Sequence, residues 1–121
     1  MKYLLMIYFN QETFDSLSEE ERQGVFQGHM DFMNSLNESG ELIDNVALAD
    51  PSHSVTVRVR NSVPAITDGP YVESKEYLAG YYMVDCETKE RAAELAAMIP
   101  DARFSTLEVR PLMSTDGADV G

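Results

Sequence analysis

The sequence predicts an α+β domain in which two helices cover one face of an antiparallel sheet. Short segments with strand composition alternate with two longer segments whose apolar residues recur at helical spacing. The chain has 121 residues, of which 44% are hydrophobic and 25% charged, a profile typical of one globular domain. There is no internal repeat and no interdomain linker, so we expect a single domain over residues 1–113, followed by a flexible tail over 114–121.

Two segments have large apolar residues at every position. Tyr3–Phe9 and Tyr77–Val84 are apolar on both alternating faces. A strand of this kind is covered on both sides of its sheet. One layer of helices covers only one side, so something else must cover the other.

The first helix is predicted over Ser18–Ser39. Ser18 and Glu21 form a capping box, and Gly40 stands where a glycine ends a helix. Its apolar stripe is flanked by Phe26 and Met33 and consists of Val25, His29, Phe32 and Leu36.

Two glycines, Gly24 and Gly28, lie inside this helix. Each weakens a helix by about 1 kcal/mol relative to alanine. Either another part of the chain approaches the backbone closely at these positions, or the cost is tolerated.

A hairpin is predicted in the middle of the chain, after a strand over Leu42–Leu48. In Val55–Arg60 the valines alternate with polar residues, so the valines are expected to face a core. Asn61 and Ser62 connect this strand to a second arm that contains Pro64, which favours a sheet edge.

The second helix begins at Thr88, which can cap it, and ends at Pro100. The last strand is predicted over Ser105–Arg110. The helix presents one apolar face, which contains Ala92, Leu95, Ala96 and Ile99.

This order of elements is that of a ferredoxin-like plait with an extra hairpin. The face of the sheet without helices is expected to be apolar, and a second copy of the chain is the simplest cover for it. We therefore expect a face-to-face homodimer that encloses a cavity between two sheets.

The net charge and the N-terminal segment of the chain restrict the functions that the protein can have. A formal charge of −12 disfavours nucleic acid and anionic membranes as partners. The opening Met1–Phe9 resembles a secretory signal but lacks a small-residue cleavage site and is too short to span a bilayer, so we expect a cytoplasmic protein.

Cys86 is the only cysteine and is expected to be a small buried hydrophobic residue rather than a nucleophile.

His29 is the strongest single candidate for chemistry because it falls on the apolar stripe of the first helix. An inward imidazole needs hydrogen-bond partners and can carry a proton near neutral pH. The alternative is a structural histidine at the margin of the core. His53 lies in a polar loop, and two histidines without a shared motif predict no metal site.

The stretch T-D-G-P-Y-V-E-S-K-E, residues 67–76, places acidic and basic side chains beside an apolar strand. Asp68, Glu73 and Glu76 with Lys75 could line a pocket and supply an acid and a base. They could equally form a solvated loop or a cap that fixes the dimer.

Other side chains are candidate ligand contacts. Arg58 and Arg60 share one side of a strand and could hold a carboxylate or phosphate, or pair with acidic neighbours. Tyr81 offers a hydroxyl at the sheet surface, although dimer packing explains it equally well.

Taken together, these motifs resemble the YCII-related family and in particular its DGPF-type branch, whose hallmark is D-G-P-F, an acidic-rich stretch and T-K-E. The resemblance extends from about Met1 to Met113. Tyr71 replaces the usual phenylalanine, Val72 a small residue and Ser74 a threonine, changes that could alter a pocket without threatening the fold.

The resemblance implies a dimeric α/β barrel and an acid–base pair of a histidine on the first helix with an aspartate. His29 occupies the position of that histidine. Asp68 is our choice for the aspartate, and Asp50 is the alternative. We also expect Asp68, or Glu73 and Glu76, to border a pocket with His29, with Lys75 balancing their charge.

Two functions follow as expectations. The first is a small cofactor-independent enzyme, a lyase, isomerase or dehydrochlorinase acting on a cyclic or enolic substrate, with Arg58 holding an anionic group. The second is a non-catalytic module that binds a small ligand or a protein such as a sigma factor.

Overall fold

The computed structural model describes residues 1–113; the predicted tail over 114–121 lies outside this range. A four-stranded antiparallel sheet has the order β2-β5-β1-β6, and a separate hairpin pairs β3 with β4. The strands are β1 (Lys2–Asn10), β2 (Leu42–Ala47), β3 (Val55–Arg60), β4 (Val63–Asp68), β5 (Glu76–Asp85) and β6 (Thr106–Pro111).

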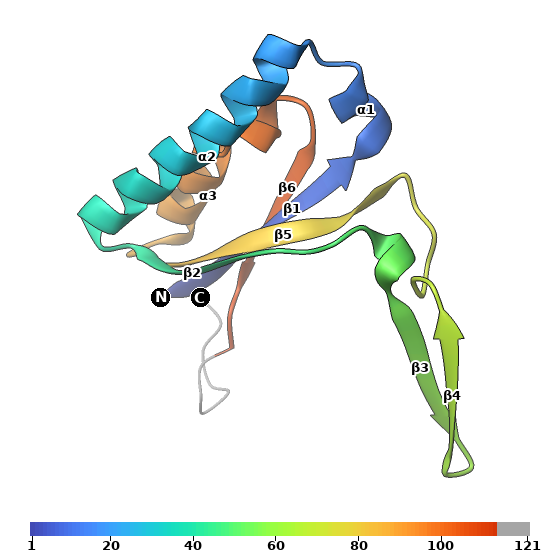
Figure 1. Cartoon of the computed structure of the whole chain (residues 1–121). Helices are drawn as coiled ribbons and strands as arrows, with labels where there is room; N and C mark the ends of the chain where they lie inside the picture. Colours follow the sequence, from blue (N-terminus) through green and yellow to red (C-terminus); the bar gives the residue numbers. More distant parts are fainter. Residues whose placement is uncertain (114–121) are drawn as a thin grey trace.

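The two long helices lie on the same face of the four-stranded sheet (Figure 1). Both predicted starts are confirmed: Ser18 forms a capping box with Glu21, and the Thr88 side chain accepts from the Arg91 backbone. Gly40 ends the first helix in the left-handed conformation, with a φ of 77°. The helices are α1 (Gln11–Asp15), α2 (Glu19–Ser39) and α3 (Lys89–Met98), with the short 3-10 segments η1 (Pro51–His53) and η2 (Pro100–Arg103).

The short helix α1 was not predicted from the sequence. It begins at Asn10, whose side chain accepts a hydrogen bond from the Thr13 backbone. Five residues are too few to produce a helical repeat of apolar positions, so periodicity gives no signal here. None of the helices in the described range is long and apolar enough to cross a membrane.

The core lies between the helices and the sheet. Alternate residues of β1 and β5 point toward the helices, because successive side chains of a strand face opposite ways. Leu5 of β1 pairs with Tyr82 of β5, and both are buried. The remaining buried members of this cluster are Tyr3, Ile7, Phe32, Leu36, Val84, Cys86, Ala92, Leu95, Ala96 and Ile99.

The opposite face of the sheet carries no helix (Figure 1). The register places the intervening residues of the two central strands on this face. Its apolar members on those strands are Leu4, Met6, Tyr8, Leu78, Tyr81 and Met83. The expectation of a helix-free apolar face is therefore confirmed, whereas the pairing of two copies across it stays a prediction.

The hairpin β3–β4 extends away from the sheet and away from α2 and α3 (Figure 1). Its separation from the main sheet agrees with the predicted extra hairpin and with Pro64 at a sheet edge. The prediction that its valines face a core is wrong for the single chain, since Val55, Val57 and Val59 are 55–59% exposed. The alternation predicted the strand correctly, but no element within residues 1–113 covers that side of the hairpin.

Candidate functional site

His29 lies in the middle of α2 and is hydrogen bonded through both ring nitrogens. Its Nε2 is 2.5 Å from Oδ1 of Asp101, and its Nδ1 is 2.6 Å from the hydroxyl of Tyr82. The three residues come from α2, η2 and β5. A histidine whose two nitrogens both have partners is held in one ring orientation.

Asp101 is the buried carboxylate of this site, with only 5% of its surface exposed. It follows Pro100, which ends α3 as predicted and starts η2. Pro100 packs against α2 at Gly28: a Cβ added there would lie 2.5 Å from the proline Cγ. The glycine thus allows η2 to approach the helix closely enough for Asp101 to reach His29, whereas a Cβ added at Gly24 would meet nothing within 4 Å.

Tyr82 completes the network from the sheet. Burial, and then the charge of Asp101, raise the pKa of its hydroxyl to about 12. The ring of Tyr82 stacks beside His29, with centroids 5.9 Å apart, and meets Phe32 edge to face at 4.9 Å. At neutral pH the hydroxyl therefore keeps its proton and is fixed in position by two aromatic neighbours.

The network can hold His29 in either protonation state. An ionised carboxylate only accepts, so Nε2 carries a proton that it donates to Asp101. When His29 is neutral, Nδ1 accepts from the Tyr82 hydroxyl; when His29 is protonated, Nδ1 donates to the same oxygen after the hydroxyl rotates. In both states each ring nitrogen of His29 keeps a partner, so the imidazole can gain or lose a proton without changing its orientation.

The predicted aspartate is not the one that contacts His29. Asp68 ends β4 and is exposed, and the alternative, Asp50, is exposed and caps η1 through the Ser52 backbone. That hydrogen bond lowers the pKa of Asp50. The structure brings Asp101 to His29 instead, a residue that the sequence reasoning did not consider.

The charged residues after the turn also lie away from His29 in the single chain. Glu73, Lys75 and Glu76 are exposed, and the His29 nitrogens are occupied by other residues. Glu76 is the first residue of β5 and pairs with Asn10. The expectation that these carboxylates border a pocket with His29 stays a prediction.

The D-G-P-Y turn packs back onto the hairpin. Gly69, with a φ of 99°, donates its backbone N–H to Ser54 and accepts from the Thr56 hydroxyl. The side chain of Arg58 then lies over the Tyr71 ring, 5.3 Å from its centroid, a favourable cation–π distance. The turn therefore packs against one side of the hairpin, and its interpretation as a cap that fixes the dimer stays a prediction.

Tyr81 lies on the face of the sheet opposite His29. It neighbours Tyr82 in β5, and Tyr82 points toward the helices, so Tyr81 points toward the helix-free face. A cavity between two sheets would therefore be bordered by Tyr81 but not by the imidazole of His29. His29 and Tyr81 were both candidate site residues, but the sequence could not show that they lie on opposite sides of the sheet.

His53 is exposed in η1. Within residues 1–113 no group of three or more histidine, cysteine or acidic side chains is arranged to hold a metal ion.

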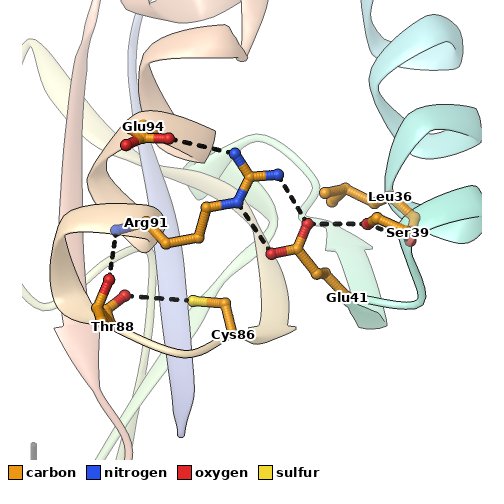
Figure 2. A network of polar contacts seen from close by, with 7 residues as sticks. All are labelled: Leu36, Ser39, Glu41, Cys86, Thr88, Arg91 and Glu94. Carbon is orange, nitrogen blue, oxygen red and sulfur yellow. Dashed lines mark hydrogen bonds and ion pairs between the residues drawn. The ribbon is translucent and has the colours of Figure 1, made fainter.

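A second polar network joins α3 to the end of α2 (Figure 2). The Arg91 guanidinium donates two hydrogen bonds to Glu41, at 2.9 and 3.0 Å, and a third to Glu94 at 3.2 Å. Arg91 lowers the pKa of Glu41, and Ser39 also donates to Glu41 at 2.8 Å. This network is satisfied by its own members and ties the two helices together.

Cys86 lies beside this network and is buried, as expected. Its Sγ lies 3.4 Å from the Thr88 carbonyl, to which it donates, and burial raises the pKa of the thiol. A buried thiol with a raised pKa is a poor nucleophile, in agreement with the interpretation as a packing residue.

The fold and the site define an α+β domain with a helix-borne histidine and a buried aspartate. The model of the YCII-related domain matches residues 1–116, and the chain belongs to this family. It is also 30% identical over 114 residues to the uncharacterized protein R00369 of Rhizobium meliloti (strain 1021). That match covers 93% of this chain and 92% of the relative.

Proposed function

We propose that this protein is a small acid–base enzyme in which His29 carries a proton and Asp101 orients it. The supporting observation is the 2.5 Å contact between His29 Nε2 and the buried Asp101 carboxylate. A buried carboxylate fixes the tautomer of the imidazole and stabilises its protonated form. The substrate class is the one that the family resemblance implies, a small cyclic or enolic compound, and the reaction uses no cofactor.

The exposed part of the network determines where a substrate meets it. The side chain of His29 is 24% exposed, whereas Asp101 and Tyr82 are almost fully covered. Since Asp101 occupies Nε2, a substrate reaches His29 at Nδ1 by displacing the Tyr82 hydroxyl. Tyr82 then acts as a positioning residue that holds the ring until the substrate arrives.

A ligand screen followed by a turnover assay tests this proposal. Cyclic enols, halogenated phenols and small carboxylates would be screened by thermal shift on the wild type, His29→Ala, Asp101→Asn and Asp68→Asn. We expect a compound that stabilises the wild type and Asp68→Asn but not His29→Ala. Its turnover should be lost in His29→Ala and retained in Asp68→Asn.

The contrary outcome is also defined. If no compound binds, or if bound compounds stabilise His29→Ala as strongly as the wild type, the network is structural. The alternative function then takes precedence, a non-catalytic module that binds a small ligand or a protein such as a sigma factor. The observation favouring it is that both nitrogens of His29 are already satisfied within the chain.

The proposal includes a cytoplasmic homodimer with the helix-free sheet faces packed together. Leu4, Tyr81 and Met83 supply apolar contacts from the two central strands. Burying such a face against a second copy removes apolar surface from water at about 25 cal/mol per Å². Sedimentation of the wild type and of Met83→Lys tests this assembly, and a wild type that sediments as a monomer at all concentrations contradicts it.

A further inference from the structure

The hairpin Val55–Asp68, called the arm below, has one face that the described part of its own chain leaves uncovered. Val57 of β3 pairs with Ile66 of β4, and the alternation puts Val55, Val59 and Pro64 on the same face. Val57 is 56% and Ile66 68% exposed. A row of β-branched side chains on a strand pair is the composition of a buried surface, so this face requires a cover.

The opposite face of the arm is already occupied by the chain itself. Thr56 and Arg58 lie on that face, where Thr56 donates to Gly69 and Arg58 stacks on Tyr71. The turn after β4 therefore packs on the polar face and leaves the valine face open. A partner of the arm must meet the valines.

The direction and length of the arm indicate which partner it meets. The arm extends away from α2 and α3, which is the side of the helix-free sheet face (Figure 1). A six-residue strand spans about 20 Å, whereas packed sheets lie about 10 Å apart. If a second copy packs on the helix-free face, the arm is long enough to pass alongside its sheet.

The charge distribution favours the same partner. The arm contains Arg58 and Arg60 against one acid, Asp68, and has a net charge of +1. The whole chain has a charge of −12, so the rest of it carries −13. Among the described residues, neither arginine forms an ion pair. A basic arm placed against an acidic body lowers the repulsion between two copies.

We infer that the arm clasps a second copy of this chain, with the face of Val57 and Ile66 against the apolar side chains of that copy. This inference rests on the homodimer proposed above and extends it, because it assigns the interface a second contact outside the paired sheets. Each arm reaches across to the other copy, so a two-fold dimer contains the contact twice.

Two double variants with the same added charge test the assignment. Val57→Lys with Ile66→Lys places two charges on the valine face, and Ala65→Lys with Thr67→Lys places two on the other face. Sedimentation equilibrium would measure the dimer dissociation constant of both, of the wild type and of Met83→Lys, and circular dichroism would confirm that each variant is folded. The arm is separate from the main sheet, so these changes leave the core intact.

We expect the valine-face variant to raise the dissociation constant by about tenfold or more, because a lysine in an apolar contact is desolvated. The control should stay within about threefold of the wild type, since added exposed charge changes little. Equal weakening by both variants, or no change in either, overturns the inference while leaving the sheet-face dimer in place. If only Met83→Lys loses the dimer, the inference about the arm is likewise overturned and the sheet-face dimer stands. If the wild type is a monomer, both the proposed dimer and the inference about the arm are overturned.

Discussion

Oδ1 of Asp101 lies 2.5 Å from Nε2 of His29, although the two residues are 72 positions apart in the chain. Their neighbours are also in contact, since Pro100 packs on Gly28. Two consecutive residues of α2 thus contact two consecutive residues of η2. The contact between proline and glycine sets the distance between the two elements, and the contact between carboxylate and imidazole supplies the chemistry.

The two glycines of α2 should respond in opposite ways to alanine. Gly24→Ala should stabilise the protein by up to about 1 kcal/mol, because its Cβ meets nothing within 4 Å and alanine favours a helix. Gly28→Ala should destabilise it by about 1–3 kcal/mol, because the added Cβ overlaps the Pro100 ring. Urea denaturation of both variants measures the difference, and equal effects would show that Pro100 adjusts freely.

Replacing the buried carboxylate should cost more than replacing the exposed one. Asp101→Ala leaves the Nε2 proton of His29 without its acceptor and should lower the unfolding free energy by about 1–3 kcal/mol. Asp68→Ala, at an exposed position, should change it by no more than about 0.5 kcal/mol. A loss in Asp68→Ala as large as that in Asp101→Ala contradicts this assignment.

Alkaline unfolding should report the burial of Tyr82. Its folded-state pKa is raised to about 12, so the folded protein holds this proton after the unfolded chain has released it. The stabilisation, about 2–3 kcal/mol, is present below about pH 10 and is lost as the pH rises toward 12. The unfolding free energy of Tyr82→Phe should therefore fall less steeply over this range.

Tyr77→Phe is the matched control for this measurement, because the pKa of Tyr77 is also raised, first by burial and then by Asp50 and Asp15. Its removal should flatten the alkaline slope less than Tyr82→Phe does, since Tyr77 is only partly covered. Slopes in the reverse order would place the more strongly buried hydroxyl at residue 77.

Activity of Tyr82→Phe distinguishes two routes for the proton. If substrate displaces the hydroxyl from His29, the phenylalanine variant should retain kcat within about tenfold of the wild type, while His29→Ala loses about 100-fold or more. If kcat falls as much in Tyr82→Phe as in His29→Ala, the proton instead passes through the Tyr82 hydroxyl. The compound found in the ligand screen serves as substrate for both assays.

The Arg91 network should contribute through Glu41 rather than Glu94. Glu41→Gln removes the charge from a carboxylate that accepts two guanidinium hydrogen bonds, so it should cost about 1–3 kcal/mol at neutral pH. Glu94→Gln alters a single contact at an exposed position and should cost about 0–0.5 kcal/mol. Chemical denaturation of the two variants at low salt provides the comparison.

Acid titration adds a second readout for Glu41. Arg91 lowers the folded-state pKa of this carboxyl below its ordinary value of 4.5, so its stabilisation is present above that value and is lost as the pH falls through the folded-state pKa. Glu41→Gln should therefore approach the stability of the wild type in acid. A stability difference that is the same at acid and neutral pH would exclude an ionic contribution.

The secondary structure was predicted well because its signals are local. Ser18, Glu21 and Gly40 cap α2 through hydrogen bonds within a few residues of each end, and the alternation of Val55–Arg60 defines a strand by itself. The same patterns gave the order of elements and the two helices on one face. The helix α1 was missed because its only signal is the cap at Asn10.

The site was predicted only in part, because its contacts join distant segments. The position of His29 on an apolar stripe marked it as a candidate, but no local pattern reports that the path of η2 brings Asp101 rather than Asp68 beside it. The sequence alone determined where the helices and strands lie and which side chains alternate, since those depend on near neighbours. Only the tertiary structure decided which carboxylate meets the imidazole and that the valine face of the hairpin has no cover among residues 1–113. Both depend on how segments far apart in the sequence pack.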